Sequence, residues 1–175
     1  MARCPGILAF QMSARPRYVI CVCTANVCRS PMAEALLRHA LAAEPEPLKS
    51  LRVTSAGVSA WGGAPITPLS ATVLKKVGLD MSKHISKALS PELLSQAVLV
   101  VCMTESHRRA IRMDYPEYEG PILLMRETLP PPADPEVPDP YGADLPTYEE
   151  TRDAIVEAIP SLVRYLRELV GKEAE

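Results

Sequence analysis

Short apolar runs alternate along the chain with longer segments whose apolar residues recur at helical spacing. The apolar runs are rich in β-branched residues and predict buried strands. The four predicted strands are Tyr18–Val22, Arg52–Ala56, Val98–Met103 and Ile122–Met125. The run that begins at Val98 is the most apolar and is predicted to be the central strand. Such continuous apolar runs are typical of a parallel sheet that is covered on both faces.

Helix signals fill the intervals between these runs. Proline, alone or after a hydroxyl-bearing residue, marks several helix starts, and Gly78 marks one helix end. The predicted helices begin near Pro31 and then span 67–77, 90–97, 105–113 and 147–170. Pro160 lies inside the last of them, so we expect a kink or two helices end to end. Strands that alternate with helices predict an α/β fold, here a small three-layer domain.

The composition fits one domain and excludes several classes of protein. The chain has 175 residues and a formal net charge of −2, which argues against a nucleic-acid partner. No apolar run approaches the roughly 20 residues that a membrane-spanning helix needs, so we expect no membrane partner. The apolar patch Gly6–Phe10 is too short for a signal peptide. We expect residues 1–16 to form a flexible N-terminal extension, 17–171 a single domain and 172–175 a C-terminal tail.

Proline is unusually frequent, and its distribution is uneven. The chain has 18 prolines, of which nine lie within residues 116–146. Such a cluster predicts an ordered loop, a linker or a disordered segment.

Five cysteines occur in the chain, in a number and spacing that predict no disulfide framework. Cys21, Cys23 and Cys28 lie close together, which indicates either a metal cluster or a reactive thiol. A zinc site needs a fourth ligand at a suitable spacing, and no second cysteine or histidine pair supplies one. We therefore expect no metal and no cofactor, and reduced thiols in the cytoplasm.

The segment CTANVCRSP carries the clearest chemical signal. It lies between a predicted strand and a predicted helix, and Cys23 and Arg29 form the C-x5-R pattern of cysteine-dependent phosphatases. The intervening backbone N–H groups can surround a tetrahedral anion, and the helix N-terminus adds positive charge. We expect Cys23 to attack phosphorus as a thiolate and Arg29 to hold two phosphoryl oxygens. The predicted substrate-binding residues of the loop are Thr24, Ala25, Asn26, Val27, Cys28 and Ser30.

Such a mechanism also needs a general acid that protonates the leaving oxygen. Asp139 lies between two prolines, whose stiff backbone suits a catalytic carboxylate. Alternatively, Asp139 only shapes a turn, as Asp134 before Pro135 would. The residues alone leave both interpretations open.

Four segments together resemble the low-molecular-weight protein tyrosine phosphatases of bacteria. They are, in order, VCTANVCRSPMAEALL, RVTSAGVSAW, KHISKAL and VPDPYG. The resemblance implies a three-layer α/β/α fold with a four-stranded parallel sheet and metal-independent hydrolysis of phosphotyrosine on proteins. It implies that Cys23 is the nucleophile, Arg29 the phosphate clamp, and Asp139 the general acid and later the base. It also implies a supporting hydrogen-bond network of Asn26, Ser30, Ser55 and His84.

The resemblance also bears on Cys28 and on the substrate. In the family a second loop cysteine can form a reversible disulfide with the nucleophile, whereas the residue alone is equally consistent with a small buried filler. Trp61 and Tyr141 match positions where the family places the walls of an aryl slot, although each alone is also typical of a half-buried packing residue. We therefore predict that a phosphorylated protein is the partner, that inorganic phosphate is a product, and that the chain is a monomer or weak dimer.

Three alternatives to a tyrosine phosphatase remain. The protein-arginine phosphatases, a branch of the same family, share CTAN, PMAE and YEETRD with this chain but look to have Thr where it has Val27. Without that hydroxyl a site should discriminate poorly for a guanidinium, so we favour phosphotyrosine. An arsenate reductase would need downstream shuttle cysteines. A non-catalytic phosphate-binding module would have lost Cys23, Arg29 or Asp139, and this chain keeps all three.

The chain departs from the family pattern at Ala25. The family usually has Gly at this position, and alanine there would be strained if the backbone were left-handed.

Overall fold

The computed structural model describes residues 17–172, and the predicted extension 1–16 lies outside the described residues. Four parallel strands form one sheet in the order β2-β1-β3-β4. They are β1 (Tyr18–Cys23), β2 (Arg52–Gly57), β3 (Ala97–Cys102) and β4 (Ile122–Leu124). All four predicted strands are confirmed, with ends that differ by one residue. The strand predicted to be central, β3, shares the middle of the sheet with β1.

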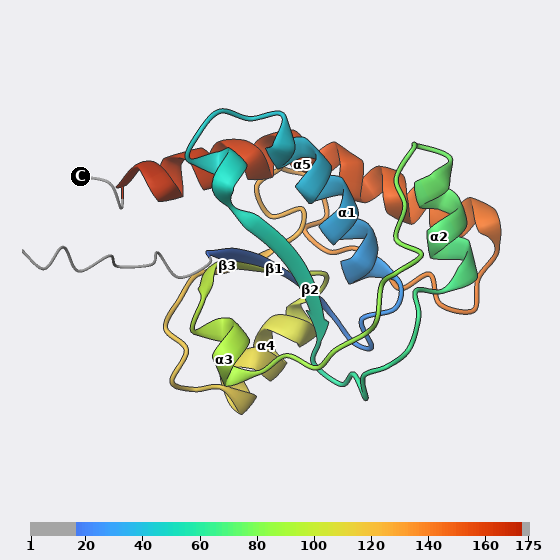
Figure 1. The fold of residues 1–175 in the computed structure, drawn as a ribbon, viewed down its shortest axis with the longest axis horizontal. Coiled ribbons are helices and arrows are strands. Elements are labelled where there is room, and N and C mark those ends of the chain that lie inside the picture. The colour runs from blue at the N-terminus through green and yellow to red at the C-terminus, as the bar shows by residue number, and fades with distance from the viewer. Residues whose placement is uncertain (1–16, 173–175) are drawn as a thin grey trace, which may run out of the picture.

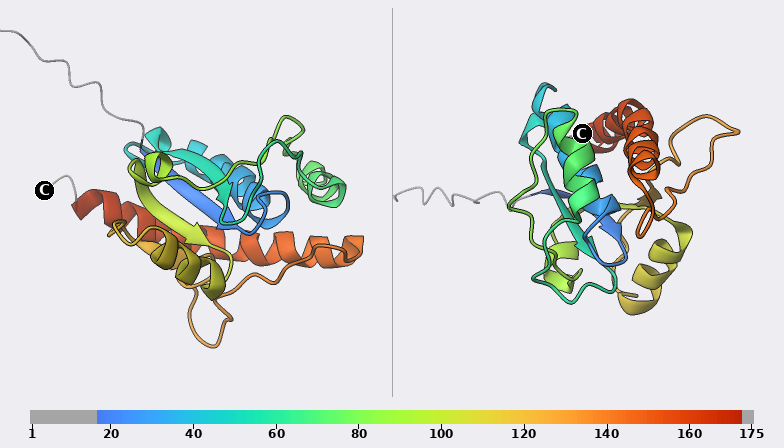
Figure 2. Two further views of the ribbon diagram at one scale, coloured as in Figure 1. Left: turned by 90° about the horizontal axis from the view of Figure 1, so that it is seen from below. Right: turned by 90° about the vertical axis from the view of Figure 1, so that its right-hand side faces the viewer.

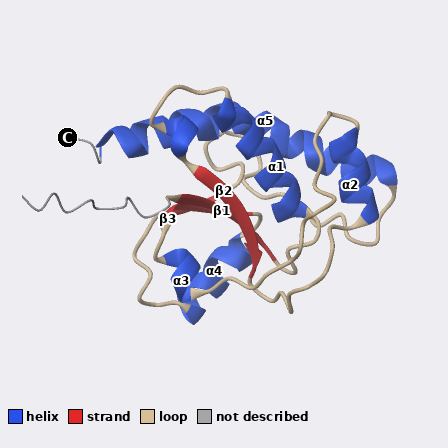
Figure 3. Ribbon diagram, in the orientation of Figure 1, coloured by secondary structure: helices blue, strands red, loops and turns tan. Residues whose placement is uncertain are grey.

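The helices cover both faces of this sheet (Figure 1 and Figure 3). They are α1 (Arg29–Ala42), α2 (Pro68–Lys75), α3 (Pro91–Leu94), α4 (Glu105–Asp114) and α5 (Leu145–Lys172), with a 3-10 turn at Leu48–Ser50. Figure 2 shows α1 and α5 on one side of the sheet and α3 and α4 on the other. The three-layer α/β/α fold is therefore confirmed.

Strand β1 shows why the core divides into two layers. Val19, Cys21 and Cys23 belong to the larger core cluster beneath α1, α2 and α5. Ile20 and Val22 belong to the smaller cluster beneath α3 and α4. Because successive side chains of a strand point to opposite faces, an uninterrupted apolar run fills both layers.

Helix α5 is one continuous helix with Pro160 inside it, so the prediction of two helices end to end is wrong. Ile155 and Ala158 before the proline, and Leu162 and Leu166 after it, are fully buried against the core. This packing face continues past the proline, so the helix is unbroken although Pro160 lacks an N–H to donate. Among the described residues, no helix combines the length and the apolar character needed to cross a membrane.

The proline-rich segment between β4 and α5 is an ordered loop that crosses the carboxyl end of the sheet. The Arg126 N–H donates to the Pro135 carbonyl at 3.1 Å, and the Val137 N–H donates to the Met103 carbonyl at 2.8 Å. Val137 is fully buried. The segment thus lies beside the end of β1, where the CTANVCRSP loop begins.

Candidate active site

The loop between β1 and α1 packs tightly against the end of β2. Cys23 pairs with Gly57 in the sheet, and Ser59 donates its N–H to the Thr24 carbonyl at 2.9 Å. Asn26 carries the left-handed backbone conformation, with φ 59°, and no other non-glycine residue among those described does so. Ala25 therefore lacks the left-handed conformation that would strain alanine, because that conformation falls one residue later. Asparagine tolerates that conformation better than most residues.

A buried hydrogen-bond network holds the loop from behind. The Asn26 side-chain amide donates to Ser30 Oγ at 2.9 Å and to Ser55 Oγ at 2.8 Å, and its carbonyl accepts from the Lys87 N–H at 2.9 Å. His84 Nε2 lies 2.8 Å from the Asn26 backbone oxygen. The structure thus brings together the four residues predicted to support the loop.

This network determines which way the Ser30 hydroxyl points its hydrogen. Ser30 Oγ accepts from the Asn26 amide, so its own hydrogen is free for another acceptor. Cys23 Sγ lies 3.0 Å away, and the Ala56 carbonyl lies farther away, at 3.4 Å. A thiolate can only accept, so the Ser30 hydroxyl can donate to the sulfur of ionised Cys23 and stabilise it.

Arg29 and Asp139 meet at the mouth of this loop. Arg29 is buried in the first turn of α1, and its Nη2 donates to Asp139 Oδ2 at 2.9 Å. Its Nη1 donates to the Val137 carbonyl at 3.2 Å. Asp139 Oδ1 accepts from the Tyr141 N–H at 3.2 Å, which orients the carboxylate. Asp134, predicted to shape a turn, accepts from the Glu136 N–H and does not line the cavity.

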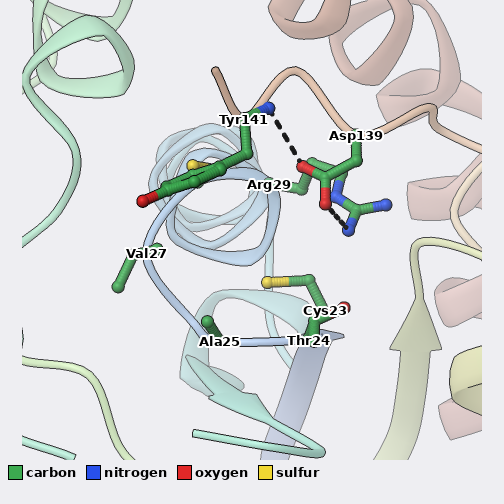
Figure 4. A pocket seen from close by; sticks show the side chains of 8 residues that line it. Cys23, Thr24, Ala25, Val27, Arg29, Asp139 and Tyr141 are labelled. Atoms are coloured by element: carbon green, nitrogen blue, oxygen red, sulfur yellow. Dashed lines mark hydrogen bonds and ion pairs between the residues drawn. The ribbon is translucent and has the colours of Figure 1, made fainter.

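These groups line one open cavity of about 280 Å³ (Figure 4). Figure 4 shows Cys23 opposite the ion pair of Arg29 and Asp139, with Val27 and Tyr141 at the rim. The lining residues are Cys23, Thr24, Ala25, Val27, Cys28, Arg29, Asp139 and Tyr141. Nucleophile, clamp, acid and most of the predicted loop residues therefore share one site.

The structure does not place Trp61 at this cavity, which corrects its predicted role as a wall of the slot. Its side chain is fully exposed. The neighbouring Gly63 donates its N–H to the Ser86 carbonyl at 3.0 Å, and the Ala64 N–H donates to Ser86 Oγ at 3.0 Å. The loop is thus fastened to the segment around Ser86, and the indole extends into solvent.

Cys28 is buried among hydroxyl groups beneath the loop. Its Sγ lies 3.3 Å from Thr67 Oγ1 and 3.6 Å from the Tyr148 hydroxyl. Burial, followed by the Cys28 thiol, raises the pKa of Tyr148 to about 12. Thr67 also donates to Ser70 Oγ, so its side chain does not cap the backbone of α2 as predicted. The disulfide between Cys28 and Cys23 stays a prediction, since both thiols are free.

Two polar residues of the site escaped prediction. Glu34 Oε2 accepts from the Ser55 hydroxyl at 2.6 Å and so extends the supporting network to α1. His107, on the other side of the loop, lies 2.9 Å from Thr24 Oγ1 and is buried. Burial and the positive charge of Arg29 lower the pKa of His107 to about 4. Their only signals in the sequence are an acidic residue one turn after the loop, and a histidine three residues after Thr104.

Comparisons with known proteins agree with this geometry. Among curated relatives, a protein-arginine-phosphatase of Bacillus subtilis is 35% identical over 85% of this chain and 96% of its own length. A probable low molecular weight protein-tyrosine-phosphatase of Ralstonia nicotianae is 31% identical over 86% of this chain and 97% of its own length.

Solved structures show the same two groups of relatives. A low molecular weight protein tyrosine phosphatase from T. tengcongensis matches with a TM-score of 0.77 and 37% identity, over 85% of this chain and 99% of that one. An arginine phosphatase from Geobacillus stearothermophilus matches with a TM-score of 0.76 and 31% identity, over 87% of this chain and 94% of that one. The family model described as low molecular weight phosphotyrosine protein phosphatase matches residues 18–173. This chain therefore belongs to the low molecular weight phosphotyrosine protein phosphatase family.

Proposed function

We propose that the protein is a metal-independent cysteine phosphatase that hydrolyses phosphotyrosine on proteins. The observation that carries the proposal is the meeting of Cys23, Arg29 and Asp139 around one cavity, although Arg29 and Asp139 lie 110 positions apart. These three groups supply a nucleophile, an anion clamp and a proton donor, which are the parts that phosphoryl transfer through cysteine requires.

The first step transfers the phosphoryl group to sulfur. The Cys23 thiolate attacks phosphorus, the bond from phosphorus to the tyrosyl oxygen breaks, and Asp139 gives its proton to that leaving oxygen. The Ser30 hydroxyl, 3.0 Å from Sγ, stabilises the thiolate before the attack. The products of this step are the dephosphorylated tyrosine and a phosphocysteine.

The second step releases phosphate. The Asp139 carboxylate removes a proton from water as the water oxygen attacks phosphorus, and the bond between sulfur and phosphorus breaks. This step restores the thiolate of Cys23 and the acid form of Asp139, and it yields inorganic phosphate. No metal takes part in either step.

Arg29 is suited to hold the phosphoryl group in both steps. Its Nε is buried and has no hydrogen-bond partner among the described residues. A buried donor without a partner is costly, and a phosphoryl oxygen in the cavity would supply the missing acceptor. Together with Nη2, which now pairs with Asp139, it provides two parallel donors for two oxygens.

The rim of the cavity supports an aryl substrate. Ala25 and Val27 present methyl groups and Tyr141 its ring to the opening, and Val27 has no hydroxyl to bind a guanidinium. Stacking on a ring and contact with methyl groups suit the flat face of phosphotyrosine. Phosphoarginine is the second candidate, since relatives at 35% and 32% identity are named protein-arginine-phosphatases.

Turnover of phosphotyrosine and phosphoarginine peptides by the same protein tests the substrate. We expect wild type to prefer phosphotyrosine, and Val27→Thr to shift the ratio toward phosphoarginine. A wild type that prefers phosphoarginine contradicts the substrate class but not the mechanism.

The mechanism has its own test. Cys23→Ser should abolish turnover while inorganic phosphate still binds, and a chelator should leave wild-type activity unchanged. Asp139→Asn should slow the reaction most for substrates with poor leaving groups, whereas the matched Asp134→Asn should have little effect. The reverse order of the two aspartate variants would identify Asp134 as the acid.

We also propose that the enzyme acts in the cytoplasm on phosphorylated proteins, as a monomer or weak dimer. The nucleophile must stay reduced, and the cytosol maintains free thiols. Cell fractionation with an antibody, and light scattering of the purified protein, test the location and the oligomeric state. Recovery from an oxidising compartment, or a tight oligomer, would contradict the respective part of the proposal.

A further inference from the structure

A buried histidine contacts the phosphate-binding loop from the side opposite to the Asn26 network. His107 is the third residue of α4, and its Nε2 lies 2.9 Å from Thr24 Oγ1. Thr24 directly follows Cys23, lines the same cavity and is exposed. No part of the phosphatase mechanism described above uses either side chain.

The surroundings of His107 indicate which ring nitrogen carries the hydrogen. The Thr104 N–H donates to Nδ1 at 3.2 Å, and the Thr104 hydroxyl oxygen lies 2.9 Å from the same nitrogen. Because a backbone N–H can only donate, Nδ1 is assigned as the acceptor and the ring hydrogen is assigned to Nε2. The pKa of about 4 keeps the ring neutral in this form at neutral pH. Nε2–H therefore donates to Thr24 Oγ1.

This contact leaves the Thr24 hydroxyl with one free hydrogen. Its oxygen accepts from His107, and no acceptor for its hydrogen lies within reach among residues 17–172. An exposed hydroxyl at the cavity wall, with its oxygen held from behind, presents that hydrogen to whatever occupies the cavity. Under the proposed function the occupant is a phosphoryl group, whose charged oxygens are strong acceptors.

We propose that His107 is a positioning residue that orients the Thr24 hydroxyl as a hydrogen-bond donor to a phosphoryl oxygen. The loop would then bind phosphate through a side-chain donor as well as through Arg29 and the backbone. This inference rests on the proposed phosphatase function, because it assigns Thr24 a role in binding the phosphoryl group.

A purely structural role for His107 must be separated from this one. His107 also completes a capping box at the start of α4, in which Thr104 and His107 each bond the other's backbone. A role confined to the cap would change the stability of α4 without any specific effect on phosphate. Two amide substitutions of His107 distinguish the roles. An asparagine amide reaches only as far as the position of the imidazole Nδ1, whereas a glutamine amide reaches the position of Nε2.

The test therefore uses His107→Gln and His107→Asn as a matched pair, with Thr24→Val and Thr24→Ser. Asparagine offers a carbonyl to the Thr104 N–H but does not reach Thr24, whereas glutamine can serve both. We expect Thr24→Val and His107→Asn each to lower kcat/KM for an aryl phosphate by about 10- to 100-fold, the effect of one lost hydrogen bond to a charged group. His107→Gln and Thr24→Ser should stay within a few-fold of wild type.

Inorganic phosphate provides a readout without turnover. In a Cys23→Ser background, calorimetric titration should show weaker phosphate binding for Thr24→Val and for His107→Asn, and no further loss in the double variant. Equal losses in His107→Asn and His107→Gln that follow the unfolding midpoint would overturn the proposal in favour of a capping role. So would a Thr24→Val variant with wild-type phosphate affinity. Failure of the phosphatase function itself would appear separately, as a wild-type protein without turnover.

Discussion

Gly57, at the end of β2, is the position where the smallest possible substitution should do the most damage to the site. A Cβ at this residue would lie 2.4 Å from the Thr24 carbonyl oxygen, 2.8 Å from Ala60 Cβ and 3.0 Å from the Asn26 nitrogen. The first and third of these atoms belong to the backbone of the phosphate-binding loop. Gly57 has no left-handed φ, so the effect of Gly57→Ala comes from crowding alone.

The distances give the size of the effect. Ordinary contact begins at 3.4 Å, so the Thr24 oxygen must move by 3.4 − 2.4, or about 1 Å. A misplacement of about 1 Å in a catalytic site costs on the order of 100-fold in rate. Crowding of this kind lowers the free energy of unfolding by only about 1–3 kcal/mol, which leaves a typical domain folded.

Two measurements on the same protein separate these effects. We expect kcat/KM for an aryl phosphate to fall about 100-fold in Gly57→Ala, while urea unfolding shows a folded protein at 25 °C. Gly171→Ala is the matched control, because a Cβ there meets nothing within 4 Å, and it should leave kcat/KM unchanged. A Gly57→Ala protein with activity within twofold of wild type would refute the reasoning, and so would a loss that follows the folded fraction.

Three further predictions concern residues around the site. Asn26→Ala should lower the free energy of unfolding by about 3–4 kcal/mol in urea, because it removes three side-chain hydrogen bonds and strains a left-handed residue; a loss below 1 kcal/mol would contradict it. The pKa of His107 falls from 6.5 to about 4 on folding, so the unfolded chain binds the proton more tightly. His107 should therefore contribute about 3 kcal/mol to the free energy of unfolding above pH 6.5, and this contribution should be lost as the pH falls to 4. His107→Gln should lose that part of the pH dependence of the free energy of unfolding. Parallel curves of unfolding free energy against pH for wild type and variant would contradict this assignment to His107. Trp61→Ala should change the free energy of unfolding by less than about 0.5 kcal/mol and leave turnover of a small aryl phosphate unchanged, since the indole is exposed and lies outside the cavity; a tenfold loss would restore it to the site.

The parts of the site that lie close together in the sequence could be predicted from it. Cys23 and Arg29 follow a strand and open a helix, so their chemistry and their structural context are read from the same few residues. The strands were equally clear, because burial on both faces leaves uninterrupted apolar runs. Asp139 needed the family resemblance, since its contact with Arg29 spans 110 positions.

Contacts between distant segments account for what prediction missed. His107 reaches Thr24 across 83 positions, and nothing near either residue indicates the other. The predicted place of Trp61 at the cavity is wrong for a related reason. The course of its loop depends on hydrogen bonds to Ser86, 25 positions further along (86 − 61). The alternative of two helices that meet at Pro160 is wrong because local propensity does not include a packing face that continues past the proline.

The span of the Arg29–Asp139 ion pair also bears on how the enzyme becomes active. Closing a loop of 110 residues has a large entropic cost, and contacts that close shorter loops cost less. Chain segments that hold β1 and α1 alone carry the thiol and the guanidinium but lack the acid. During refolding, turnover of substrates with poor leaving groups should therefore appear only with the complete fold. Turnover of such substrates should therefore report complete folding.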